Sequence, residues 1–162
     1  MTLRHLAVGV VVLAAACGVF PERVTASDPR VKSLFAAMAA VDRTALGFTP
    51  VPADAELRLE VGPRSGYDVM LHIESRTSRT VSFRKTASGY EWIGEQEIHR
   101  GPKKWVGPDG EFAEEVTITV QRVPGTGNTG ITYSGEDPRL AFPRKLTLAD
   151  VEPILAEWDS PK

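Results

Sequence analysis

Hydrophobic and polar residues alternate in four segments of this chain of 162 residues, and this pattern restricts the fold more than any other feature. Successive side chains of a strand point to opposite faces, so a period of two is typical of strands with one face on a core. The hydrophobic positions are Leu57, Leu59 and Val61; Tyr67, Val69, Leu71 and Ile73; Val81 and Phe83; and Val116, Ile118 and Val120. Turn-forming residues separate the segments at 76–78, 87–89, 107–110 and 124–130. The sequence therefore predicts an antiparallel sheet of five to seven strands.

A helix is predicted before this sheet and another after it. Asp28 is a good N-cap, hydrophobic residues follow at helical spacing, and Gly47 is a natural stop. The first helix is therefore expected over about residues 29–46. The second is expected over about residues 151–158, with Pro153 in its first turn, where proline is tolerated.

The predicted fold class is therefore α+β, with an N-terminal helix, a curved antiparallel sheet and a short C-terminal helix in a single domain over residues 27–162. A hydrophobic content of 42% and a charged content of 25% are ordinary for a soluble globular protein. The order of the elements would suit a cystatin-like or NTF2-like cone, an analogy that rests on this order alone.

The N-terminal residues 1–26 have the composition of a signal peptide. Arg4 gives a positive start, and residues 6–20 form an uncharged run that is shorter than the roughly 20 apolar residues of a membrane-spanning helix. Residues 24–26 place small side chains where a signal peptidase reads them, so cleavage is expected after Ala26. The sequence therefore predicts an exported bacterial protein, either periplasmic or secreted.

Residues 13–17, Leu-Ala-Ala-Ala-Cys, support an alternative, because they resemble a bacterial lipobox. In that motif the cysteine is lipidated and becomes the first residue of the mature chain. Leu13 lies one position too early for the usual pattern. In this alternative residues 1–16 are a lipoprotein signal, and the chain contacts the membrane of the cell envelope only through a lipid on Cys17. Cys17 is the only cysteine, so the domain itself has none for a disulfide or a thiolate metal site.

Glu95, Glu97 and His99 are the most suggestive candidates for chemistry, because alternate residues of a strand share one face. Two carboxylates and an imidazole in a row would suit metal-assisted hydrolysis or acid–base catalysis. His72, on a neighbouring predicted strand, is a fourth candidate. The plainer interpretation is a solvated strand face with ordinary polar residues, and we favour it because no metal-ligand spacing of known type is present. We therefore expect no metal site and no cofactor.

The direction of these three side chains depends on the strand register around residues 87–89. With a two-residue loop at 88–89, Phe83 lies opposite Gly94, and the three side chains point away from the core. With a three-residue loop, Phe83 lies opposite Ile93 and they point inward, because a slip of one residue exchanges the two faces. We expect the first register, since burying unpaired charge is costly.

A second group of residues is a candidate for ligand binding. Lys103, Lys104 and Trp105 lie in a predicted loop that begins at Arg100, and they combine positive charge with an aromatic ring. Arg84 adds a positive charge on the polar side of its strand. An anionic glycan, a lipid head group or an acidic partner would suit these side chains. A hairpin flank with solvated lysines is the plainer interpretation.

The sequence carries no GxSxG elbow, P-loop or HExxH motif. Its net charge of −2 gives no sign of the basic surface that is typical of nucleic-acid binding. The first hypothesis is therefore a non-catalytic envelope or secreted protein that binds another envelope protein, a glycan or a small ligand. The alternatives are a small metal-assisted hydrolase that uses His99, Glu95 and Glu97, and a structural accessory subunit of an envelope assembly.

Overall fold

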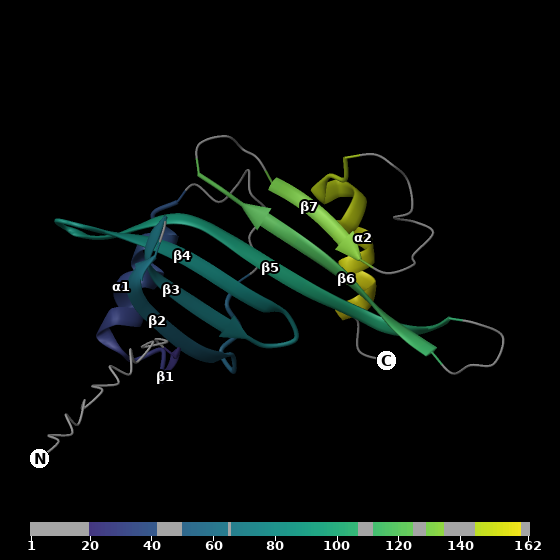
Figure 1. Cartoon of the computed structure of the whole chain (residues 1–162), viewed down its shortest axis with the longest axis horizontal. Coiled ribbons are helices and arrows are strands. Elements are labelled where there is room, and N and C mark those ends of the chain that lie inside the picture. The colour runs from purple at the N-terminus through teal and green to yellow at the C-terminus, as the bar shows by residue number, and fades with distance from the viewer. Residues whose placement is uncertain are drawn as a thin grey trace, which may run out of the picture.

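In the part of the chain that it describes, the computed structural model has one seven-stranded antiparallel sheet and two helices (Figure 1). The residues that it describes are 20–41, 50–64, 66–106, 112–124, 129–134 and 145–159. The elements follow in the order β1 (Glu22–Val24), α1 (Pro29–Ala39), β2 (Glu56–Arg64), β3 (Tyr67–Glu74), β4 (Ser78–Thr86), β5 (Gly89–Val106), β6 (Phe112–Arg122), β7 (Thr129–Ser134) and α2 (Leu148–Asp159). The α+β class and the antiparallel sheet are confirmed, and seven strands lie within the expected number.

The sheet is a meander, because the strands are ordered from β1 to β7 as they are in the chain. Each strand is antiparallel to its neighbours. The short strand β1 precedes α1, so the expected placement of a helix as the first element is not confirmed. The chain therefore contributes residues to one edge of the sheet before it enters its first helix.

Helix α1 packs on one face of the sheet, where Arg30 near its start bonds to Glu22 of β1 and other residues of the helix contact β5. Its N-cap is Asp28, whose carboxylate accepts a hydrogen bond from the backbone N–H of Arg30 at 2.8 Å. The helix ends at Ala39, before the expected end at about residue 46. Its buried residues belong to a first hydrophobic cluster, which comprises Val24, Val31, Leu34, Met38, Leu57, Leu59, Val69, Leu71, Ile73, Val81, Phe83 and Trp92.

Helix α2 begins at Leu148 rather than at about residue 151, and Pro153 lies inside it instead of in its first turn. The carboxylate of Asp150 accepts hydrogen bonds from the backbone N–H of Thr147 at 2.8 Å and from its hydroxyl at 2.7 Å, which fixes this start. The helix belongs to a second hydrophobic cluster, which comprises Val116, Ile118, Val120, Leu146, Val151 and Ile154. Neither helix is long and apolar enough to span a membrane, as judged from the described residues.

Both hydrophobic clusters lie on the same face of the sheet, because directly opposed residues of antiparallel strands point to the same side. Val81 of the first cluster pairs with Glu95, and Glu97 pairs with Val120 of the second cluster. Figure 1 shows α1 beside β2 to β4 and α2 behind β6 and β7. The two helices therefore cover separate parts of one face, and each of them contacts the long strand β5.

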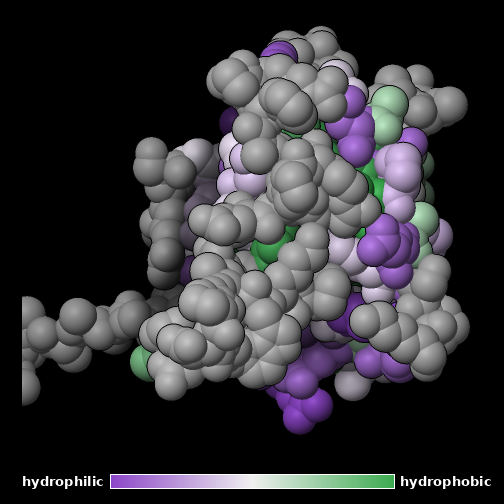
Figure 2. Space-filling model, turned by 90° about the vertical axis from the view of Figure 1, so that its right-hand side faces the viewer, coloured by the Kyte–Doolittle hydropathy of each residue, from purple (hydrophilic) through white to green (hydrophobic). Residues whose placement is uncertain are grey.

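The molecular surface at the α2 end is mixed in polarity. Figure 2 shows strongly hydrophilic residues and hydrophobic residues next to one another in the described part of this face. The large hydrophobic side chains that this part exposes are Phe20, Val61 and Val123. They lie before β1, within β2 and after β6, so they are dispersed along the chain.

Next to its loop, the hairpin between β4 and β5 has neither of the two registers considered from the sequence, but beyond Ile93 its pairing is that of the three-residue-loop alternative. Thr86 pairs with Gly89, so the loop consists of residues 87–88. Phe83 lies opposite Trp92, and both side chains are buried on the helix-covered face. The register that we expected is therefore wrong from the loop onward.

A β-bulge in β5 then changes the face on which its later residues lie. The register shifts between Ser82 and Phe83, so that Ser82 pairs with Gly94 and Ile93 is the extra residue. Gly94 has a φ of +150°, a backbone conformation that glycine adopts readily. Because the bulge adds one residue, Glu95 points to the helix-covered face.

Replacing Gly94 by alanine should lower the free energy of unfolding by about 1–3 kcal/mol. The added Cβ would lie 3.2 Å from the carbonyl oxygen of Arg122, and the positive φ disfavours any side chain. Gly130→Ala is the matched control, because its Cβ would make only an ordinary contact with Gln121 at 3.8 Å. We expect that control to change stability by less than about 0.5 kcal/mol in urea denaturation. Equal losses for the two variants would contradict a special backbone at the bulge.

Candidate functional site

Five charged or titratable side chains are buried on the helix-covered face, between the two hydrophobic clusters. We call them the buried charge cluster: Arg79 of β4, Glu95, Glu97 and His99 of β5, and Arg122 of β6. Their exposed fractions are 4%, 5%, 0%, 7% and 2%, in that order. The expectation that the three β5 residues point away from the core is therefore wrong. Buried charges of this kind require internal partners, and the cluster supplies them.

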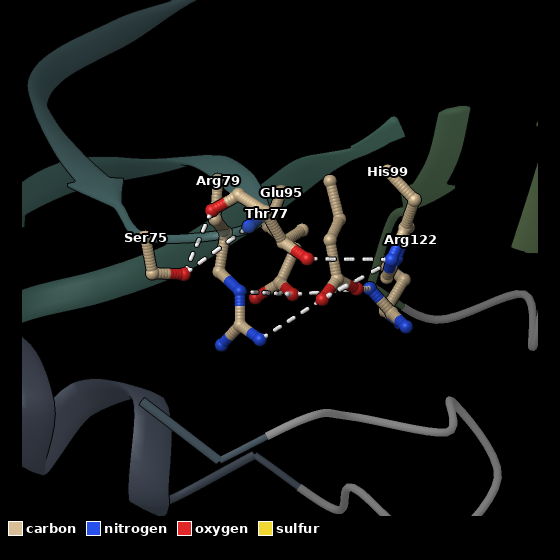
Figure 3. Close-up of polar contacts among 7 residues, drawn as sticks. Ser75, Thr77, Arg79, Glu95, His99 and Arg122 are labelled. Atoms are coloured by element: carbon tan, nitrogen blue, oxygen red, sulfur yellow. Dashed lines mark hydrogen bonds and ion pairs between the residues drawn. The ribbon is translucent and has the colours of Figure 1, made fainter. Parts of the chain in front are cut away.

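Two arginines neutralise the two carboxylates. Arg79 Nη2 donates to Glu97 Oε1 at 3.1 Å, and Arg122 Nη1 donates to Glu97 Oε2 at 2.6 Å. Arg122 Nη1 also donates to Glu95 Oε1 at 3.2 Å, and Arg79 Nε lies 3.8 Å from that same oxygen. Figure 3 shows Arg79 and Arg122 on opposite sides of the group. Among the described residues, each of the two arginines is therefore paired with each of the two carboxylates, and the pairs join three strands.

His99 connects this network to the turn that precedes β4. Its Nε2 lies 3.6 Å from Glu97 Oε1, and its Nδ1 lies 3.4 Å from the hydroxyl oxygen of Thr77. The hydroxyl of Ser75 donates to the carbonyl of Thr77 at 3.1 Å and accepts from its N–H at 3.2 Å. These bonds hold the turn so that Thr77 lies close to the imidazole (Figure 3).

The surroundings of Glu97 keep it ionised. Burial alone would raise the pKa of Glu97, because removal from water disfavours the charged form. The hydrogen bond with His99 and the positive charges of Arg79 and Arg122 act in the opposite direction and prevail. The pKa of Glu97 therefore lies well below its ordinary value of 4.5. Glu97 is a carboxylate throughout the physiological pH range.

Arg79 and Arg122 were not singled out from the sequence, although a signal was present. Arg79 alternates in phase with Val81 and Phe83, and Arg122 alternates in phase with Val120. A charged residue at a core position of a strand requires a buried partner of opposite charge. Two such arginines indicate that two carboxylates on neighbouring strands also point inward.

A cavity of about 460 Å³ opens beside the buried charge cluster. Its volume lies within the range of about 300–1,000 Å³ that is typical of small-molecule sites. The cavity lies between the segment that precedes β2, the turn before β4 and the end of α2. Its polar lining includes Asp54, Ser75, Arg76, Thr77, Arg79 and Glu97. The cluster therefore reaches a space that a small ligand can occupy.

Arg79, which lines this cavity, has one donor that the described residues do not use. Its Nη1 is buried and has no hydrogen-bond partner among the described residues, whereas its Nε and Nη2 face Glu95 and Glu97. Figure 3 shows the guanidinium of Arg79 with one terminal nitrogen turned away from the carboxylates. Leaving a buried donor without an acceptor costs about 1–3 kcal/mol. An oxygen atom placed beside Nη1 would therefore be bound favourably.

His72 lies on the opposite face of the sheet from His99. It alternates with the buried residues of β3, and its Nε2 is 3.4 Å from Glu60 Oε2 while its Nδ1 is 3.3 Å from Thr80 Oγ1. The two histidines therefore do not converge on one site. Within the described ranges, no group of three or more His, Cys, Asp or Glu side chains is arranged to hold a metal ion.

The remaining candidates lie apart from the buried charge cluster. Arg84 is exposed and forms an ion pair with Glu91 at 3.6 Å. Residues 103–105 were expected in a loop, but β5 continues through them and pairs them with residues 113–115 of β6. The expectation of a loop there is wrong, because the bulged strand is longer than its alternating pattern indicates. Cys17 and the proposed lipobox lie outside the described residues.

No protein-family model, curated protein or solved structure matches the chain. The function is therefore inferred from the buried charge cluster and from the cavity beside it.

Proposed function

We propose that this chain is an exported, non-catalytic protein that binds a small polar ligand in the cavity beside the buried charge cluster. The observation that carries the proposal is Nη1 of Arg79, a buried donor of a charged group that lies at a cavity and is not used by the described residues. Export is supported by the signal-like residues 1–26. A lipid anchor at Cys17 would change the location of the protein and leave this cavity unchanged.

The lining of the cavity disfavours an anionic ligand, because its acidic residues outnumber its basic ones. The charged residues of the lining are two cations, Arg76 and Arg79, and three anions, Asp54, Glu97 and Asp159. Arg79 offers a donor to the ligand, whereas the exposed carboxylate of Asp54 offers an acceptor. Hydroxyl groups satisfy both, because each can accept and donate. A saccharide unit or another small polyol is therefore the ligand class that fits this lining.

The electrostatics favour binding over acid–base catalysis. A general acid must carry a proton at the working pH, and an effective general base has a pKa near that pH. Glu97 meets neither condition, because its pKa is held well below the ordinary range. The separation of His72 from His99 removes further support from the hydrolase alternative. A purely structural subunit would need a large exposed hydrophobic patch, and the described residues expose only three large hydrophobic side chains.

Ligand-observed NMR with neutral monosaccharides and polyols tests the proposal, with acetate and phosphate as charged probes. We expect saturable binding of a neutral probe, and Arg79→Lys should weaken it roughly 10–100-fold, since a hydrogen bond to a charged group contributes about 1.5–3 kcal/mol. Asp54→Ala should also weaken binding, and it should leave the fold intact because Asp54 is exposed. Glu152→Ala, which removes an exposed acid on α2, is the matched control and should bind as the unchanged protein does.

Circular dichroism of each variant separates loss of binding from loss of fold. The proposal fails if no probe binds saturably, or if Arg79→Lys and Asp54→Ala both bind as tightly as the parent. If acetate or phosphate binds and the neutral probes do not, the position of the site stands and the proposed ligand class is wrong.

A further inference from the structure

The strand β1 limits where the mature protein can begin. Cleavage after Ala26, the position expected from the sequence, would remove all of β1 (Glu22–Val24). This strand pairs with residues 57–59 of β2 and forms one edge of the sheet. Its removal would leave the backbone groups of β2 unpaired along that edge.

Val24 makes β1 part of the hydrophobic core. Val24 is 9% exposed and belongs to the first hydrophobic cluster, whereas the side chain of the neighbouring Arg23 is 77% exposed. Val24 also lines a cavity of about 790 Å³ together with Met38 of α1 and Leu57 of β2. Without β1, these two hydrophobic side chains would lose a covering neighbour and face water.

Contacts also join β1 to the start of α1. The guanidinium of Arg30 donates from Nη1 to Glu22 Oε2 at 3.0 Å and from Nη2 to Glu22 Oε1 at 3.2 Å. Two parallel bonds of this kind give a specific geometry as well as energy. The N–H of Asp28 donates to the carbonyl of Thr25 at 3.0 Å. These contacts connect the two sides of the cleavage position after Ala26.

We propose that the signal peptide is removed upstream of β1, so that the mature protein retains this strand. The inference rests on the proposed export. Upstream of β1, Ala14 and Ala16 supply small residues at the −3 and −1 positions for hydrolysis of the bond before Cys17. The reaction consumes one water molecule and leaves a carboxylate on Ala16 and an amine on Cys17. Residues 17–21 then precede β1 in the mature chain.

The intact mass of the full chain recovered from a bacterial envelope fraction tests this proposal. A form that begins at any residue from 17 to 21 supports it, and added acyl mass on Cys17 would distinguish a lipid-anchored form from a freely soluble one. A form that begins at Ser27 overturns the proposal and leaves the export premise intact. A form that retains Met1 overturns both.

Two full-chain variants give a matched second test, because a large charged residue at −1 blocks a signal peptidase. Ala16→Lys acts on the upstream position, and we expect it to abolish the processed form. Ala26→Lys acts on the downstream position, and Ala26 is exposed, so the fold should tolerate the change. We expect this variant to be processed at the same bond as the unchanged chain. Processing of Ala16→Lys together with a block in Ala26→Lys would overturn the proposal.

Discussion

Replacing Glu97 by glutamine should lower the free energy of unfolding by about 3–5 kcal/mol, which is the effect of breaking a buried ion pair on one side. Glu97 is fully buried and accepts hydrogen bonds from Arg79 at 3.1 Å and from Arg122 at 2.6 Å. Glutamine keeps the shape of the side chain but removes its charge and one of its two acceptor oxygens. Two buried guanidinium groups, those of Arg79 and Arg122, would then each lose a charged partner. Urea denaturation at pH 7 measures the loss.

Glu91→Gln is the matched control for this substitution. Glu91 lies on the same strand, its side chain is 57% exposed, and it forms an ion pair with Arg84 at 3.6 Å. Exposed ion pairs contribute at most about 1 kcal/mol, so we expect a loss no larger than that. A loss for Glu97→Gln as small as the loss for Glu91→Gln would show that the carboxylate of Glu97 does not hold the cluster together.

The buried charge cluster is a poor device for stability alone. Replacing a whole buried ion network by well-packed hydrophobic residues is often neutral or stabilising, whereas removing one member is strongly destabilising. Here the network separates two hydrophobic clusters that lie on one face of the sheet. Under the proposed function, a polar lining is required at the adjoining cavity, and this requirement would account for a strip of the face that is not apolar. The Glu97→Gln variant therefore tests the contribution of the cluster to folding stability. The Arg79→Lys variant tests the contribution of the Arg79 guanidinium to ligand binding.

The strand pattern of the fold could be predicted because it is local. A period of two is recognised from each strand's own residues, and turn residues between the segments indicate that successive strands pair. The register of β5 could not be read in this way, because the bulge at Ile93 and Gly94 shifts the pairing with β4. A glycine inside a strand pattern indicates a bulge, so Gly94 was the available signal.

The candidate site could be predicted in part for a related reason. The alternation of Glu95, Glu97 and His99 on one strand shows that their side chains share a face. The expectation that this face is the outer one assumes that no buried cation is present to pair with the carboxylates. Arg79 and Arg122 are 18 and 25 residues from Glu97 in sequence, so their proximity depends on the register of three strands. Periodicity identifies which residues share a face of one strand, and it does not show which of them meet across the sheet.

Acidification should remove about 2–3 kcal/mol of folding stability through Glu97 alone. In the folded protein the pKa of Glu97 is held well below the value of 4.5 that is ordinary for an unfolded chain. The stabilisation is therefore fully present above that ordinary value. As the pH falls below it, the unfolded chain takes up a proton first, and the stabilisation is lost progressively toward the lower pKa of the folded state. Urea denaturation at a series of pH values from neutral to about pH 3 measures this loss.

Comparison with Glu97→Gln separates this effect from those of other carboxyl groups. The pKa values of Glu22 and Asp28 are also lowered, because Arg30 donates hydrogen bonds to both, so acid weakens the parent and the variant alike. The difference in free energy of unfolding between parent and variant should be largest near neutral pH. It should shrink as the pH falls below 4.5, because a protonated Glu97 resembles glutamine in charge and shape. A difference that stays constant over the whole series would mean that the charge of Glu97 does not stabilise the fold, and that its shape alone matters.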